Sequence, residues 1–179
     1  MLKKILSCGL LAGLIAGGVL SAFVLLPGEH GAPGAWAMLV GYLSMLLGLS
    51  LVFVAIKRHR DSTLGGAIRF WPAFALGLGV SFVASVVYAL AWEAALAISG
   101  IDFAGGYAHA VIEQQKAKGV SGEALAELAA DMEAFKASYA HVSYRLPMSF
   151  AEIFPVGVIV SLISAAVLRN PRVLPAKRN

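Results

Sequence analysis

Residues 72–98 read PAFALGLGVSFVASVVYALAWEAALAI and carry one formal charge, on Glu93. A helix that crosses a hydrocarbon layer about 30 Å thick needs about 20 mostly apolar residues. This stretch is longer than that, so we expect it to span a membrane. Its small residues recur at every fourth position, which places them on one face of a helix. They are Ala73, Gly77, Ser81, Ser85 and Ala89, and Glu93 is next in the same row.

The composition of the whole chain also indicates a membrane protein. Of the 179 residues, 59% are hydrophobic and 13% are charged, and the mean hydropathy is +0.80. Soluble domains carry about 25% charged residues, so a water-soluble core is excluded. Cys8 is the single cysteine and cannot form an intrachain disulfide, and the four histidines lack the spacing of a metal site. We therefore expect no metal and no other cofactor.

Three further apolar runs complete the predicted architecture. The predicted spans cover about residues 5–26, 36–56, 72–98 and 147–168, and turn-forming residues at 27–34 separate the first two. The predicted fold class is an all-α membrane protein of one domain. It has four transmembrane helices, with a helical hairpin between helices 3 and 4.

Small residues on the first and fourth spans favour close packing between helices. Gly9, Gly13 and Gly17 form overlapping GxxxG motifs on the first span, and Gly157 and Ser161 lie one turn apart on the fourth. Two interpretations of the glycine face remain open at this point. It packs within the same chain, or it forms the contact of a homodimer.

The polar segment 101–146 is predicted to be the helical hairpin, outside the cytoplasm. Apolar residues in its second half advance in steps of three or four, which gives one stripe on a helix. They are Leu125, Leu128, Met132, Phe135, Tyr139 and Val142. The stripe packs on the companion helix or on a partner protein; the acidic residues on the other faces disfavour adsorption to anionic lipid.

The distribution of positive charge predicts the orientation of the chain. With the amino terminus inside, ten of the 14 Lys and Arg residues lie on the inner side of the membrane. The positive-inside rule then places both termini in the cytoplasm of a bacterial cell, with the chain in the inner (cytoplasmic) membrane. The basic pI reflects this orientation and does not indicate a nucleic acid partner. Lys57, Arg58 and Arg60 are either a topological anchor or a contact to anionic lipid.

Two acidic residues form a candidate intramembrane polar site. Charged residues inside a membrane are costly and often functional, which makes Glu93 and Glu152 candidates. Ser149 and Glu152 also fit a capping box at the start of the fourth span. We expect both carboxylates near the outer interface, at one depth. They either act as a pair or have separate roles, with Glu152 serving the cap.

Three segments resemble a family catalogued as a domain of unknown function, family 4199. They are GYLSMLLGLSLVFVAIKRHRD at residues 41–61, SVVYALAWEAAL at 85–96 and EIFPVGVIVSLISAAVLR at 152–169. Members of that family typically have tyrosine where this chain has His59. The resemblance implies a four-span bacterial membrane protein with a variable outer helical segment. It implies no activity, cofactor or catalytic residue.

Three functions are compatible with these patterns. The first is a non-catalytic interaction or assembly subunit that uses the helix-packing faces and the outer hairpin, because no catalytic motif is present. The second is a small oligomeric transporter or channel with Glu93 as a proton or cation site. The third is a membrane enzyme that uses Glu93 and Glu152 as acid and base. The expected partners are membrane lipid and either a second copy of the chain or another membrane or periplasmic protein.

Overall fold

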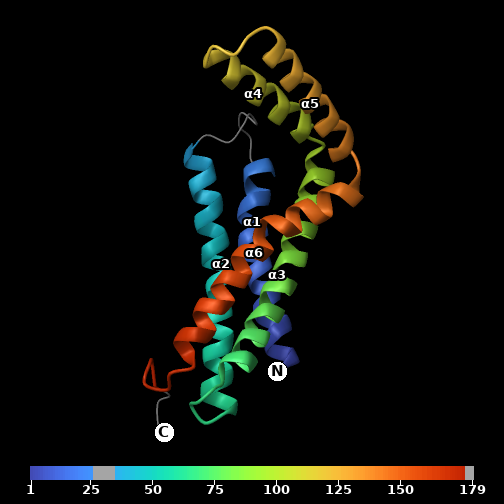
Figure 1. Cartoon of the computed structure of the whole chain (residues 1–179). Coiled ribbons are helices and arrows are strands. Elements are labelled where there is room, and N and C mark those ends of the chain that lie inside the picture. Colours follow the sequence, from blue (N-terminus) through green and yellow to red (C-terminus); the bar gives the residue numbers. More distant parts are fainter. Residues whose placement is uncertain (26–34, 176–179) are drawn as a thin grey trace.

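The computed structural model describes residues 1–25 and 35–175, without the side chains of residues 23 and 35–38. The turn predicted at residues 27–34 lies outside this part of the chain. The described residues form six helices and no strand (Figure 1). The helices are α1 (Leu2–Leu25), α2 (Ala35–Thr63), α3 (Phe70–Ser99), α4 (Phe103–Ala117), α5 (Glu123–Tyr139) and α6 (Val142–Leu168).

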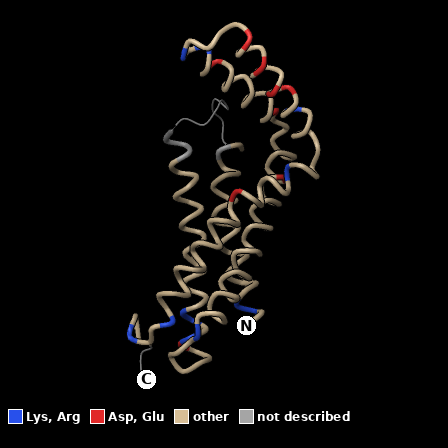
Figure 2. The backbone as a smooth tube through the Cα atoms, in the orientation of Figure 1, with Lys and Arg blue, Asp and Glu red and all other residues tan. Residues whose placement is uncertain are grey.

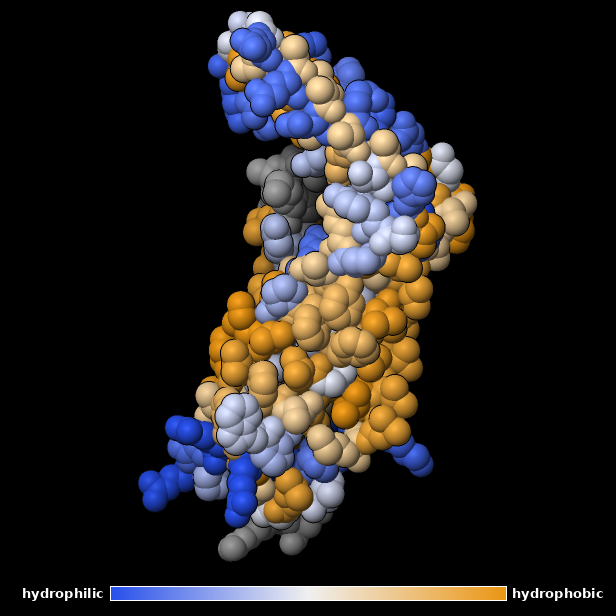
Figure 3. All heavy atoms as spheres, turned by 45° about the vertical axis from the view of Figure 1, so that its right-hand side comes forward, coloured by the Kyte–Doolittle hydropathy of each residue, from blue (hydrophilic) through white to orange (hydrophobic). Residues whose placement is uncertain are grey.

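Four of these helices are long and apolar enough to cross a membrane. The qualifying segments are Leu2–Ala22, Leu39–Thr63, Phe70–Ser99 and Val142–Leu168. They lie side by side as a bundle, and the face seen in Figure 3 carries a broad apolar zone with hydrophilic residues at both ends. The prediction of four spans is thus confirmed, and the chain is a multi-pass membrane protein.

The fourth span begins earlier than its sequence predicts. α6 starts at Val142, with His141 as its N-cap, and contains Pro147 and Pro155. Ser149 therefore lies inside the helix, and the capping box predicted for Ser149 and Glu152 is wrong. Proline inside a membrane helix is tolerated because neighbouring groups can satisfy the backbone that it leaves unpaired. The extra turns of α6 add Arg145 to this helix.

α3 is the central helix of the bundle. It packs against α1 and α6, and α2 packs against α1, α3 and α6. The core between these helices consists of aliphatic side chains from all four, and its fully buried members include Leu49, Val52, Ile56, Leu76, Val80, Ile153 and Leu168. α1 begins and α6 ends at the same end of the bundle (Figure 1).

The glycines of α1 allow it to approach α3 closely. A Cβ built on Gly13 would lie 2.5 Å from the Cβ of Val87 and 2.6 Å from the carbonyl oxygen of Ala84. The same construction on Gly9 and Gly17 meets other α3 side chains within 3 Å. Larger residues at these positions cannot be accommodated unless α1 and α3 separate. The glycine face of α1 therefore packs within this chain.

Small residues also line the contact between α3 and α6. A Cβ on Gly157 would lie 2.6 Å from the Cβ of Ser81, and one on Gly77 would lie 3.0 Å from the Cβ of Ser161. The Ser81 hydroxyl donates to the carbonyl oxygen of Gly157 (3.0 Å) and lies 3.1 Å from the Ser161 hydroxyl. Ser85, also fully buried, donates to the Ser81 carbonyl within α3. These hydroxyls satisfy backbone groups where two helices touch.

α4 and α5 lie side by side beyond the end of α3 (Figure 1). The turn between them contains Gly119 and Gly122, both with positive φ, a conformation that glycine adopts without steric cost. The apolar stripe of α5 is partly buried where the two helices pack, and Ala104 and Ala108 of α4 are buried. The predicted helical pairing of this segment is confirmed.

Candidate functional site

The end of the hairpin of α4 and α5 is attached to the bundle through Arg145, which also forms a bidentate ion pair with Glu93 of α3. Arg145 at the start of α6 donates from Nε to Oε1 of Glu93 (2.8 Å) and from Nη2 to Oε2 (2.7 Å). Its third nitrogen, Nη1, donates to the carbonyl oxygens of Tyr139 (2.7 Å) and Ala140 (3.1 Å) at the end of α5. One guanidinium therefore connects α3, α5 and α6. Both charged side chains are only 16% exposed, and paired forks of this kind are among the stronger ion pairs.

An aromatic cluster adjoins this ion pair through Tyr139, whose ring centroid lies 5.7 Å from the guanidinium carbon of Arg145. The indole nitrogen of Trp92 donates to the hydroxyl of Tyr139 over 2.7 Å. Phe103 at the start of α4 packs edge to face on Trp92 with ring centroids 5.0 Å apart, and lies 5.7 Å from Tyr139. Contacts of this geometry stabilise beyond the apolar area that they bury. We call Trp92, Glu93, Phe103, Tyr139 and Arg145 the hairpin joint.

Burial of Tyr139 affects its protonation. Loss of contact with water raises the pKa of this phenol above its ordinary value, and the hydrogen bond from Trp92 opposes part of that rise. Tyr139 therefore stays neutral over the physiological pH range and keeps its hydroxyl available as an acceptor for Trp92.

A cavity of about 560 Å³ lies beside the hairpin joint, and its lining contains Glu93, Asp102, Lys136 and Arg145. These charged groups already have partners. Asp102 accepts from the backbone amide of Gly105 at the start of α4 (2.8 Å), and Lys136 pairs with Glu133 at 3.0 Å. The cavity thus offers no set of unpaired charges for a ligand.

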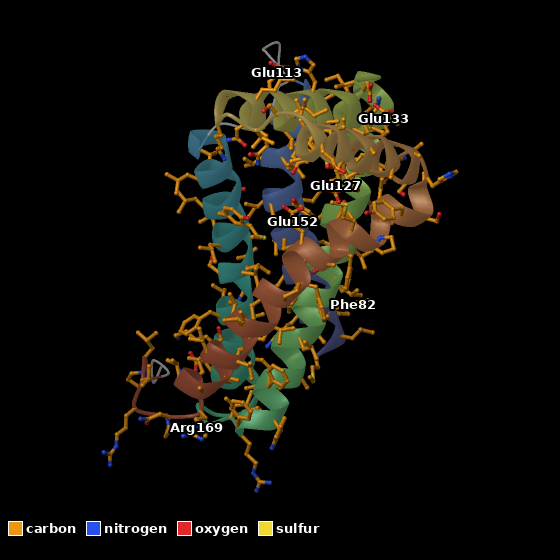
Figure 4. The ribbon with its side chains drawn as sticks, turned by 45° about the horizontal axis from the view of Figure 1, so that its top comes forward. Phe82, Glu113, Glu127, Glu133, Glu152 and Arg169 are labelled. Atoms are coloured by element: carbon orange, nitrogen blue, oxygen red, sulfur yellow. The ribbon has the colours of Figure 1, made fainter. Side chains whose placement is uncertain are left out.

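Glu152 has a different environment from Glu93. It accepts a hydrogen bond from the Tyr88 hydroxyl (3.1 Å), and no hydrogen bond joins the two glutamates in the described part of the chain. Arg145 pairs with Glu93, and Tyr88, the partner of Glu152, lies about 7.5 Å before Glu93 along α3. The two carboxylates therefore have separate partners, and their shared depth in the membrane stays a prediction. Figure 4 labels Glu152, which comes from α6, below the labelled acidic residues of the hairpin in that view.

Glu93 lies close to the end of the membrane-spanning part of α3. From Phe70 to Glu93 the helix rises about 35 Å, which is more than the roughly 30 Å of a hydrocarbon layer. The ion pair with Arg145 therefore lies toward one end of this span, and near the end of a span water and lipid polar groups reduce the cost of burying charge.

Arg60 has a structural role in place of the predicted lipid contact. It is fully buried, and its Nε donates to Oδ1 of Asp61 at 2.7 Å. Its other nitrogens donate to the carbonyl oxygens of Val173 (2.9 Å) and Leu174 (2.5 Å), with a longer bond to Leu168. A cation placed at these carbonyls stabilises the end of α6. Of the three predicted lipid contacts, Lys57 pairs with Asp61 and Arg58 is exposed.

Lys4 likewise stabilises the carboxyl-terminal end of α2. Its amine donates to the carbonyl oxygen of Arg58 (3.3 Å) and to the hydroxyls of Ser62 (2.8 Å) and Thr63 (3.0 Å). The cation thus lies at the carboxyl-terminal end of α2, where the helix dipole favours it.

Within the described residues, no three His, Cys, Asp or Glu side chains are grouped so that they could hold a metal ion.

Sequence reasoning missed Arg145 as the partner of Glu93. The charge count places Arg145 among the four Lys and Arg residues on the outer side and indicates no partner for it. The signal was available, because an acid near a membrane boundary usually has a basic partner at the same depth. The early start of α6 concealed this pairing, since the sequence places Arg145 in the segment 101–146, which is predicted to be the hairpin.

A family model described as "Protein of unknown function (DUF4199)" matches residues 11–170. Searches of curated proteins and of solved structures find no match. The matched region includes α2 to α6 and most of α1, and thus every residue of the hairpin joint. The chain therefore belongs to the DUF4199 family of membrane proteins of unknown function.

Proposed function

We propose that this protein is a non-catalytic interaction subunit, which anchors in the membrane through four helices and presents the hairpin of α4 and α5 to a partner protein. The hairpin joint is the observation that carries this proposal. A surface presented in a fixed position loses less conformational entropy when a partner binds.

The packing of the small-residue faces also supports this assignment. The small-residue faces of α1, α3 and α6 already pack within the chain, including the α1 face that was a candidate for a homodimer contact. Protein contacts by the hairpin do not compete with this packing. The hairpin is therefore the better candidate for partner binding.

The charge of the hairpin indicates the kind of partner. Residues 101–141 contain six acidic and three basic side chains. Figure 2 shows that the acidic residues of the molecule lie mainly on this part, and Figure 4 shows Glu113, Glu127 and Glu133 along it. A partner with a basic surface fits this distribution. The positive-inside rule supports an extracytoplasmic hairpin and cytoplasmic termini in a bacterial inner membrane.

The two alternative functions have less support. A transporter that uses Glu93 as its ion site needs a carboxylate that can be vacated, whereas Glu93 is held by two bonds from Arg145. An enzyme that uses Glu93 and Glu152 as acid and base needs both carboxylates at one reacting atom. Here Glu93 is bonded to Arg145 and Glu152 to Tyr88, which lies more than one helical turn before Glu93 on α3.

Site-specific photo-crosslinking in native membranes tests the proposal. A photoreactive residue at Glu127 or Glu133 should give a discrete crosslinked protein. The same residue at Leu47, which is exposed on the apolar surface of α2, should not. Introducing Arg145→Ala should reduce the hairpin crosslink, because the hairpin loses its fixed position. Crosslinks of equal yield at all three positions, or none at either hairpin position, would count against an interaction subunit.

A further inference from the structure

The end of the bundle opposite the hairpin carries positive charges that have no partner among the described residues. Five basic residues there are exposed, and their side chains make no hydrogen bond or ion pair with any described residue. They come from the start of α1, the end of α2, the residue before α3 and the segment after α6. We call them the basic face: Lys3, Arg58, Arg69, Arg169 and Arg172.

The fold separates these residues from the cations that it uses internally. Lys4 donates its hydrogen bonds to the end of α2, and Arg60 donates to the segment that follows α6. Asp61 is the acidic residue in this region, and Lys57 and Arg60 already neutralise it. No described acidic side chain is therefore left to balance the basic face.

Buried Arg60 also positions part of the basic face. By holding the carbonyl oxygens of Val173 and Leu174, it fixes the segment after α6 against the end of α2. Arg169 and Arg172 lie on this fixed segment. Figure 2 shows most of the Lys and Arg residues of the bundle gathered at this end, and Figure 4 labels Arg169 there.

An exposed tryptophan indicates that the basic face lies at the level of lipid headgroups. Trp71 at the start of α3 is 73% exposed and lies two residues after Arg69 in the chain. Its ring packs edge to face on Phe70. Indole rings concentrate where hydrocarbon meets headgroups. The guanidinium groups next to it therefore lie at the depth of lipid phosphates.

We propose that the basic face binds the headgroups of anionic phospholipids in the adjacent leaflet. Arginine forms paired hydrogen bonds with phosphate oxygens, and clustered cations at a helix end are attracted by a negative membrane surface. A soluble polyanion is a poorer fit, because lipid phosphates already surround residues at this depth. Of the lipid contact expected from the sequence, the basic face keeps Arg58. It replaces Lys57 and Arg60, which have partners inside the protein, with Lys3, Arg69, Arg169 and Arg172.

Lipid retention from mixed nanodiscs tests this proposal. The full chain is reconstituted in nanodiscs of equal parts phosphatidylcholine and phosphatidylglycerol and released for native mass spectrometry. The wild type should keep phosphatidylglycerol in preference to phosphatidylcholine. The triple variant Arg58→Gln/Arg69→Gln/Arg169→Gln should lower that preference by about fivefold or more. Raising the salt to 1 M before release should also weaken the wild-type preference.

The matched control is Lys116→Gln/Lys118→Gln/Lys136→Gln, which removes the same number of charges from the hairpin. It should keep the wild-type preference. The proposal is overturned if the wild type shows no preference, if the arginine variant keeps it, or if both variants lose it equally. Circular dichroism establishes that each variant is folded. If the triple variant does not fold, Arg58→Gln and Arg169→Gln are measured singly against Lys118→Gln. Each arginine variant should then lower the preference for phosphatidylglycerol by less than the triple variant would, and Lys118→Gln should keep it; arginine variants that keep the preference overturn the proposal.

Discussion

At the scale of single residues, the pairing of Glu93 shows both the reach and the limit of sequence reasoning. Its position near the end of a span, on the face that meets other helices, follows from the spacing of apolar and small residues. Its partner does not, because Arg145 is separated from it by the whole hairpin. Contacts between residues so distant in sequence depend on where α6 begins, and its prolines look like helix boundaries.

Loss of Arg145 should release the hairpin from the bundle. Arg145→Ala leaves the Glu93 carboxylate and two carbonyl groups of α5 without their donor, at a cost of about 2–3 kcal/mol in unfolding free energy. Chemical unfolding in detergent, followed by tryptophan fluorescence, measures this cost. Lys136→Ala, which removes an exposed pair, should change stability by about 0.5 kcal/mol or less.

A double substitution checks that the two charges act together. Glu93→Gln/Arg145→Gln removes both charges and should destabilise by less than the sum of the single variants. Strict additivity would show that the two side chains are not coupled and would contradict the bond geometry described above.

Arg60 should be essential for the stability of the end of the bundle. Arg60→Leu leaves Asp61 with one partner and three carbonyl groups without a donor, so we expect a loss of about 3 kcal/mol. Trypsin should then cleave after Arg169 and Arg172 faster than in the wild type. Arg58→Leu removes an exposed neighbour and should leave both stability and cleavage close to wild type. Equal effects of the two substitutions would refute the role assigned to Arg60.

At the scale of helices, four spans and the hairpin follow from hydrophobic periodicity, whereas the packing partner of each face does not. The glycines of α1 predict a close approach but leave its partner open, since a neighbour in the chain and a second copy satisfy the same pattern. The start of α6 differs because residues 142–146 mix polar and apolar side chains. Tertiary contacts of Arg145 compensate for that weak local signal.

Replacing Gly13 by leucine should destabilise the protein through the contact between α1 and α3. Comparison with Gly18→Leu removes the effect of helix propensity, which both substitutions share. In Gly13→Leu the new side chain meets Val87 and the carbonyl of Ala84 at distances that cannot be accommodated, so we expect a loss of about 1–3 kcal/mol. Gly18→Leu is the matched control, because a Cβ there meets nothing within 4 Å. Unfolding by a denaturing detergent compares the two. Equal stability of both variants would mean that α1 does not pack on α3 through this face.

At the scale of the whole molecule, charge and hydropathy divide the protein into three zones. The hairpin is acidic, the bundle is apolar and the opposite end is basic (Figures 2 and 3). The apolar zone follows from composition alone. The fixed position of the acidic zone depends on the hairpin joint, whose five residues come from four helices and are brought together only by folding.

The distance between the hairpin tip and the bundle tests the fixed position of the hairpin most directly. Spin labels at Lys118→Cys in the turn and Leu43→Cys on α2, in a Cys8→Ser background, report this distance by pulsed electron paramagnetic resonance in nanodiscs. We predict a narrow distance distribution in the otherwise wild-type chain and a broad one after Arg145→Ala. A broad distribution in both proteins, or one that Arg145→Ala leaves narrow, would contradict a hairpin held in place by this joint.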